Sequence, residues 1–133
     1  MTEPPRELRI EGSRVGDIPS LYVELNRVLM PDEDWTLGES LDALDDLLYG
    51  GFGVLATSPS ARIVWVDAEQ SRRALGRTAT RAWYAGKLAR PDVYASAPAR
   101  AALADLDRGA GRTYFDLVLE VFAGHSEVEL VLA

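Results

Sequence analysis

The segment Arg62–Asp67 (R-I-V-W-V-D) does most to limit the folds open to this chain. It is a compact apolar run rich in β-branched residues, which predicts a buried strand, as in a parallel sheet. Shorter strands are predicted at Glu7–Glu11, where apolar and polar residues alternate, and at Val128–Ala133. Helical patterns separate the strands, and strands joined through helices form parallel βαβ units. We therefore predict an α/β fold with a small parallel three-stranded sheet covered by helices.

Capping residues and apolar spacing predict the helices between these strands. Asp17 caps a first helix with Pro19 in its first turn, and Pro31 ends it. Later helices are predicted at Glu39–Tyr49, Ala68–Leu75, Thr80–Leu88, Ala99–Leu106 and Thr113–Ala123. The last opens with a capping-box variant, although residues 113–122 are also β-prone and a strand is the alternative. The inward-facing residues expected in Thr80–Leu88 are Ala82, Trp83, Ala85 and Leu88.

The composition fits one globular domain, residues 1–133, that needs no disulfide or metal to fold. The chain has no cysteine, which excludes thiol catalysis and thiolate metal sites and agrees with a cytoplasmic location. Its first residues do not have the pattern of a signal peptide, and no apolar run approaches the roughly 18 residues of a membrane span. We expect a cytoplasmic protein that does not bind membranes.

The net charge of −7 is concentrated in the first half of the chain. Residues 1–50 hold 12 acidic and 4 basic side chains, a net charge of −8, whereas residues 51–133 hold 9 and 10. Residues 68–112 are basic, with 9 basic and 4 acidic side chains. A negative lobe repels nucleic acid and attracts basic surfaces. Solubility alone is the competing explanation, because most charge runs are solvated faces.

The acidic stretch Trp35–Gly53 holds the clearest functional pattern. Its leucines recur at helical spacing, so one face of the predicted helix is expected to be buried. Its polar positions are acidic, and Glu39, Asp42 and Asp46 follow one another at i, i+3 and i+7, on one face. Gly50 then ends the helix. The stretch is therefore a candidate surface for a basic partner.

No catalytic constellation is evident. His125 is the single histidine and lacks an obvious nucleophile or orienting acid, so we interpret it as part of the turn before the last strand. Asp42 and Asp46 lack the further oxygen ligands that a Mg²⁺ or Ca²⁺ site needs. The glycines after the helix lack the Lys-Ser/Thr pair of a phosphate-binding loop. We predict a binding protein with no catalytic residues, metal or cofactor.

The stretch from Gly38 to Gly50 resembles the signature of the barstar family, the inhibitors of barnase-like ribonucleases. Its sequence G-E-S-L-D-A-L-D-D-L-L-Y-G is similar to the family pattern G-E-N-L-D-A-L-x-D-x-L-x-G, with Ser40 in place of asparagine. The order of predicted strands and helices also fits over about residues 6–75 and 113–133. The resemblance implies a single barstar-like domain in which residues 76–112 form a helical insertion.

The resemblance also implies a binding mode. In the family, this helix and the loop before it plug the ribonuclease active site, and two aspartates imitate the phosphates of RNA. Those aspartates are Asp42 and Asp46 here. Gly50 would allow close backbone approach, and Glu120 is the nearest match to an acid on the family's last helix.

The aromatic positions depart from the family pattern. The family's aromatic residue between the two aspartates is Asp45 here, the one after the glycine is Gly51, and the tyrosine before the helix is Thr36, next to Trp35. More charge and fewer aromatic anchors imply a different or more electrostatic partner surface. The expected partner-binding residues are Trp35, Glu39, Asp42, Asp45, Asp46, Gly50 and Glu120.

The expected function is stoichiometric inhibition of a basic extracellular or toxin ribonuclease. The inhibitor would be an antitoxin or immunity protein, monomeric when free, with no enzymatic activity and no direct contact with nucleic acid. One alternative is a protein-interaction module on the same scaffold, with a basic partner that is not a nuclease. A third class, an enzyme or nucleic-acid binder, would use the basic insertion through Arg72, Arg73 and Arg77.

Overall fold

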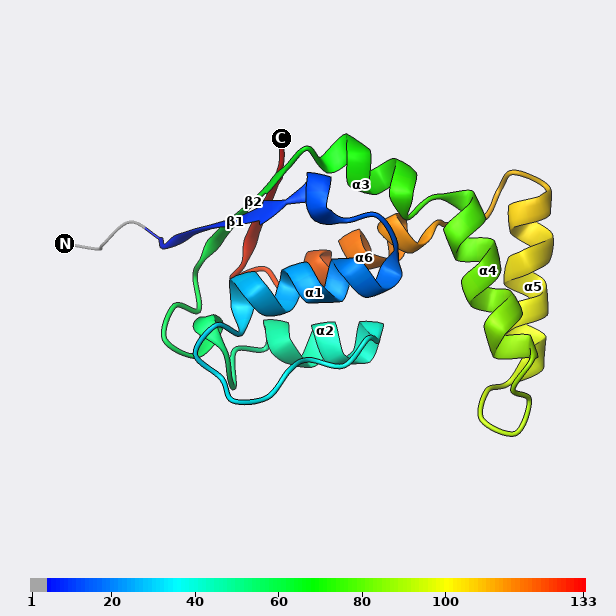
Figure 1. Cartoon of the computed structure of the whole chain (residues 1–133), viewed down its shortest axis with the longest axis horizontal. Helices are drawn as coiled ribbons and strands as arrows, with labels where there is room; N and C mark the ends of the chain where they lie inside the picture. Colours follow the sequence, from blue (N-terminus) through cyan, green and yellow to red (C-terminus); the bar gives the residue numbers. More distant parts are fainter. Residues whose placement is uncertain (1–4) are drawn as a thin grey trace.

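The computed structural model describes residues 5–133 and has an α/β fold built on a small parallel sheet (Figure 1). Its strands are β1 (Glu7–Glu11), β2 (Arg62–Val66) and β3 (Glu129–Leu132). The order in the sheet is β1-β2-β3, with Ile10 paired to Trp65 and Trp65 to Leu132. The predicted fold class, with its parallel three-stranded sheet, is confirmed.

The described residues form six α-helices, and each of the six predicted helices is present. They are α1 (Ile18–Leu29), α2 (Leu41–Leu48), α3 (Ala68–Ala74), α4 (Arg77–Leu88), α5 (Ser96–Asp107) and α6 (Tyr114–Ala123). Asp17 forms a capping box with Ser20 at α1, and Thr113 forms one with Asp116 at α6, as predicted. The alternative of a strand over residues 113–122 is wrong, because the capping box starts a helix whose apolar side faces the core.

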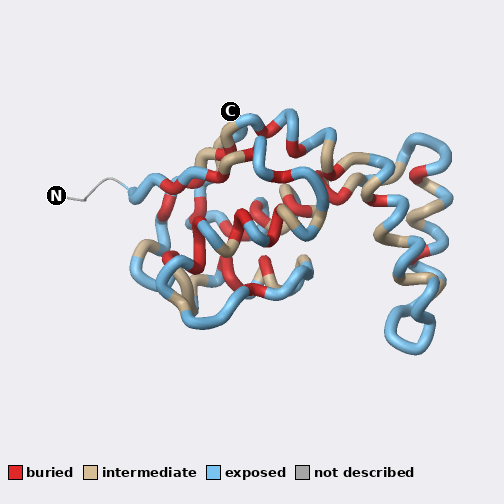
Figure 2. The backbone as a smooth tube through the Cα atoms, in the orientation of Figure 1, coloured by how far each residue is buried: buried red, intermediate tan, exposed pale blue. Residues whose placement is uncertain are grey.

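The helices α1 and α6 lie between the sheet and α2, so α2 is the furthest of these three helices from the sheet (Figure 1). The sheet turns Leu8, Ile10, Ile63 and Trp65 into the core, and the alternate residues of these strands are exposed or half-buried (Figure 2). The acidic helix is therefore the layer of the fold that faces away from the sheet.

Two tyrosine hydroxyls join α1 to α6 in the core. The hydroxyl oxygens of Tyr22 and Tyr114 lie 2.6 Å apart, and burial raises the pKa of both groups, so both stay protonated and one donates to the other. The backbone N–H of Tyr114 donates to the hydroxyl of Thr80 at 2.7 Å, and the ring of Trp83 packs edge-on against Tyr114. These contacts attach α4 to the core.

Helices α4 and α5 form a hairpin that projects from the rest of the molecule (Figure 1). The predicted inward positions Ala82 and Ala85 are wrong, since both are exposed. Only the side of α4 that carries Thr80 and Trp83 meets the core, because the hairpin stands away from the sheet. No helix in residues 5–133 has both the length and the apolarity needed to cross a bilayer.

Glu24 is a buried carboxylate on α1. It accepts the backbone N–H of Glu11 at 2.7 Å and two hydrogen bonds from the guanidinium of Arg27 at 2.6 and 2.7 Å. Burial raises the pKa of Glu24, but the hydrogen bonds from Arg27 and Glu11 outweigh burial and hold that pKa below its ordinary value. A lowered folded-state pKa stabilises the fold above the unfolded-state value of roughly 4.3, and this stabilisation is lost as pH falls through the folded-state value.

Glu24→Gln should therefore lower the free energy of unfolding at neutral pH by roughly 1–3 kcal/mol and flatten its pH dependence below roughly pH 4.3. Urea unfolding at a series of acidic and neutral pH values measures both effects. Glu69→Gln is the matched control, because Glu69 forms the same i, i+3 pair with Arg72 on an exposed surface and should change stability by less than about 0.5 kcal/mol. Equal losses in the two variants would contradict this account of Glu24.

Candidate functional site

Helix α2 presents two carboxylates to solvent from a rigid support. Leu44, Leu47 and Leu48 are buried on its inner side, and Asp42 and Asp46 are exposed on its outer side. At i and i+4, these aspartates lie one turn apart, with Cβ atoms about 5–6 Å from each other. The core therefore fixes where both charges stand.

Neither aspartate is neutralised within the chain. Among residues 5–133, no basic side chain forms an ion pair with Asp42 or Asp46. Four of the nine basic residues of the 68–112 region pair with other acids, as Arg72–Glu69, Arg81–Asp107, Arg108–Asp105 and Arg112–Glu120. The negative field of α2 is thus free to act on another molecule.

Of the two residues expected to start this helix, Gly38 and Ser40, Ser40 is its cap, so the helix itself begins two residues after the predicted Glu39. Ser40 has an extended backbone, and its hydroxyl accepts the Ala43 N–H at 3.0 Å, so the helix begins at Leu41. Glu39 is therefore not on the helical face of Asp42 and Asp46. It is exposed in the loop before α2, where it lines a groove described below.

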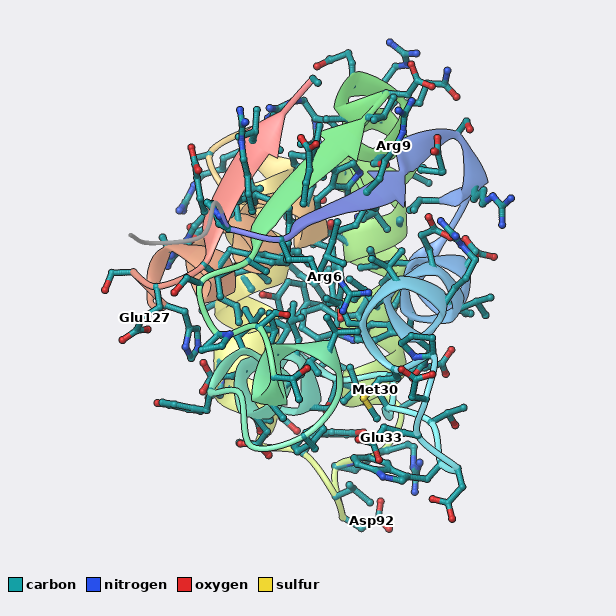
Figure 3. All side chains as sticks on the ribbon, turned by 90° about the vertical axis from the view of Figure 1, so that its left-hand side faces the viewer. Arg6, Arg9, Met30, Glu33, Asp92 and Glu127 are labelled. Atoms are coloured by element: carbon teal, nitrogen blue, oxygen red, sulfur yellow. The ribbon has the colours of Figure 1, made fainter. Side chains whose placement is uncertain are left out.

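An aromatic pair, exposed Trp35 and half-buried Phe52, connects the loops on either side of α2. Trp35, predicted near the surface, is 46% exposed, and its ring packs against Phe52 with the ring centroids 5.0 Å apart. The backbone N–H of Gly53 donates to the Glu33 carboxylate at 3.0 Å, which ties the same two loops together. Figure 3 shows Glu33 beside Met30, at the end of the molecule away from the sheet. Nothing in the sequence pattern pointed to Phe52, which stands between two glycines.

Asp45 is engaged inside the chain. Its Oδ1 lies 2.6 Å from Nε2 of His125, which is only 5% exposed, and the ring of Tyr49 packs edge-on against the imidazole. His125 does lie in the turn before β3, as predicted, but it has an acidic partner that the sequence did not reveal. Asp45 is half-buried beside His125, with 44% of its side chain exposed, and its predicted contact with a partner stays a prediction.

The Asp45–His125 contact should appear as coupling between two mutations. We expect a double-mutant cycle of Asp45→Ala and His125→Ala to give a coupling free energy of about 0.5–3 kcal/mol in denaturant unfolding. The control cycle combines His125→Ala with Asp42→Ala, since Asp42 has no contact with His125, and should be additive within about 0.5 kcal/mol. Additivity in the first cycle would show that the hydrogen bond contributes nothing to stability.

The two remaining predicted site residues have clear local roles. Gly50 has a φ of +84°, and its N–H donates to Leu47 O at 3.1 Å, so it ends α2 as predicted. Glu120 is exposed on α6 and pairs with Arg112. Unlike Asp42 and Asp46, Glu120 therefore has a cation beside it already. A role for Gly50 or Glu120 in contacting a partner stays a prediction.

The described residues contain no group of three His, Asp or Glu side chains placed to hold a metal ion. No protein-family model matches this chain, and a search among curated proteins finds no similar sequence. The arrangement itself is a rigid acidic helix with unpaired carboxylates and an aromatic pair at its edge. Such a surface is suited to binding a cationic macromolecule.

Proposed function

We propose that this chain is a barstar-like stoichiometric inhibitor of a basic ribonuclease, of the antitoxin or immunity type, acting in the cytoplasm. The inhibitor would cover the active site with the outer face of α2 and the loop before it. The observation that carries the proposal is the pair Asp42 and Asp46, which are exposed, lack an ion-pair partner among residues 5–133, and lie one turn apart on a helix held by three buried leucines.

The chemistry of a ribonuclease active site supports this assignment. Such a site binds a polyanion and therefore gathers basic side chains, to which two fixed carboxylates are complementary. Opposite charges steer the two proteins together and raise the association rate. The inhibitor needs no catalytic group, because blocking access to RNA is sufficient.

The aromatic pair supports the same surface. The residues at the family's aromatic positions here are Asp45, Gly51 and Thr36, none of which supplies an aromatic ring. Trp35 and Phe52 directly neighbour two of these positions, and their rings pack against each other at a tilt of 53°. Aromatic anchors next to charged groups are typical of residues that dominate binding energy. We therefore place Trp35 and Phe52 in the proposed interface.

The contacts of individual residues disfavour one of the two alternative functions and do not distinguish the other from the proposal. The basic region of residues 68–112 is less available to nucleic acid than its charge suggests, because four of its arginines pair with nearby acids, and the Arg72 guanidinium also lies over the ring of Phe115. An interaction module with a non-nuclease partner would use the same face of α2. The experiment must therefore measure ribonuclease activity as well as binding.

A titration against small basic secreted and toxin ribonucleases tests the proposal. With enzyme held well above the dissociation constant, RNA cleavage should fall linearly and reach zero at one inhibitor per enzyme. Binding should weaken as salt rises, because exposed charges dominate encounter. Full cleavage at a large excess of inhibitor, for every enzyme in the panel, would overturn the proposal. Tight binding that leaves cleavage intact would favour the non-nuclease module.

A further inference from the structure

A groove separates the start of α2 from the projecting hairpin. Glu39 and Asp42 line one wall, and Trp83, Lys87 and Tyr94 line the other, around a volume of about 260 Å³. The hairpin tip at Asp92 and the loop at Glu33 reach the same end of the molecule, away from the sheet (Figure 3). The groove therefore opens beside the acidic face, within reach of anything that docks there.

The aromatic wall already holds a cation. The Lys87 ammonium lies 4.0 Å from the ring centroid of Trp83 and 5.3 Å from that of Tyr94. Both distances are within the range of cation–π attraction. Among residues 5–133, Lys87 forms no ion pair, so its ammonium depends on these rings for its position. The rings thus show what kind of group the groove accepts.

The opposite wall adds negative charge. Glu39 and Asp42 are exposed, and neither is ion-paired in the described part of the chain, so two carboxylates face a wall with one ammonium. A planar guanidinium can stack on an aromatic ring and donate to a carboxylate at the same time, which an ammonium does less well. The volume is below the roughly 300–1,000 Å³ of pockets for drug-sized ligands, and it suits a single long side chain.

The aromatic wall is attached to the core before any partner arrives. Trp83 packs edge-on against Tyr114 at 4.9 Å, and Tyr114 is fixed by its hydroxyl contact with Tyr22. The N–H of Tyr114 also donates to Thr80, one turn before Trp83 on α4. A site that is already formed loses less free energy on binding than one that must be ordered.

From these observations we infer that the groove is an arginine-binding subsite. It takes one arginine side chain from the basic protein that docks on α2, an inference that rests on the proposed function. The guanidinium stacks on Trp83 and Tyr94, hydrogen-bonds to Glu39 or Asp42, and displaces the Lys87 ammonium. The α4–α5 hairpin thereby contributes a second surface, beside the acidic face of α2, to the binding of the partner.

A peptide with one arginine, acetyl-Gly-Arg-Gly-amide, tests the subsite on the free protein. The indole N–H resonance of Trp83 should shift saturably with this peptide, less with the lysine analogue, and not at all with the uncharged citrulline analogue. Tyr94→Ala should weaken binding roughly two- to thirtyfold, the range of one cation–π contact. Lys87→Met should tighten it, because the internal competitor is gone.

Val93→Ala is the matched control, since Val93 lies in the same exposed loop but does not line the groove, and it should leave peptide affinity unchanged. An unshifted Trp83 indole at the highest arginine-peptide concentration would overturn the inference, as would equal affinity in Tyr94→Ala and wild type. The peptide assay needs no nuclease. If the peptide does not bind but the protein still inhibits a ribonuclease, the subsite alone is disproved. If the peptide binds but no ribonuclease is inhibited, the proposed function alone is disproved.

Discussion

Replacing Asp42 and Asp46 together with alanine should abolish inhibition of the target ribonuclease at concentrations where the wild type is saturating. Truncating one partner of a close, desolvated charge pair costs about 2–5 kcal/mol, a range that includes measurements on the barnase–barstar complex itself. That range corresponds to roughly 30-fold to several-thousand-fold in the dissociation constant for each aspartate. The effect should be this large because no basic residue of the described chain shares either charge.

The fold should survive the double substitution. Both side chains are exposed, and an i, i+4 pair of like charges costs a helix roughly 0.2–0.5 kcal/mol, so its removal relieves repulsion. The control is Glu69→Ala with Glu129→Ala, which changes the net charge equally on α3 and β3 and should weaken binding only slightly. Calorimetric titration at two salt concentrations measures both variants. Equal affinities for the two would show that net charge, and not the α2 face, governs binding.

Gly53→Ala should destabilise the fold by roughly 2–6 kcal/mol. Gly53 has a φ of +71° and a ψ of −165°, a backbone region that is essentially restricted to glycine and costs a residue with a side chain about 1–3 kcal/mol. A Cβ atom there would lie 2.5 Å from Leu29 O and 3.0 Å from the Met30 sulfur, and such crowding typically adds about 1–3 kcal/mol. Relief would require the loop at Phe52 to shift, so binding should also suffer.

Gly51→Ala supplies the control two residues earlier. A Cβ atom on Gly51 meets nothing within 4 Å, and its φ is not positive, so alanine should leave stability within about 0.5 kcal/mol of wild type or raise it slightly. Guanidinium unfolding of both variants measures the change in the free energy of unfolding that each alanine causes. Similar stabilities for Gly53→Ala and Gly51→Ala would mean that the loop moves freely away from the end of α1.

Local patterns were sufficient to predict most of the fold. Asp17 and Thr113 are capping residues whose effect lies within the next few positions, so the starts of α1 and α6 were readable from sequence. The apolar β-branched run at β2 was equally local. The start of α2 was less certain, because Gly38, Glu39 and Ser40 offer competing starts. Only the hydrogen bond that the Ser40 hydroxyl accepts from the Ala43 N–H selects one of them.

The contacts at the candidate site could not be predicted from the sequence, because they join residues that are far apart in the chain. Asp45 and His125 are 80 positions apart, and no local pattern could bring them together. The groove likewise joins residues of the α2 entrance to Lys87 and Tyr94, which a linear pattern assigns to an ordinary basic surface. Helical spacing also failed to predict that Ala82 and Ala85 are exposed. The hairpin projects from the molecule, so the way it is attached decides which of its sides meets the core.

Amide hydrogen exchange of the chain, free and bound to the ribonuclease it inhibits, tests the central claim most directly. If the outer face of α2 closes the active site, exchange should slow most across Trp35–Gly53 on binding, with a second slowed segment at the tip of the α4–α5 hairpin. Strong protection confined to β1, β3 or α3, with exchange across residues 35–53 unchanged, would contradict the account.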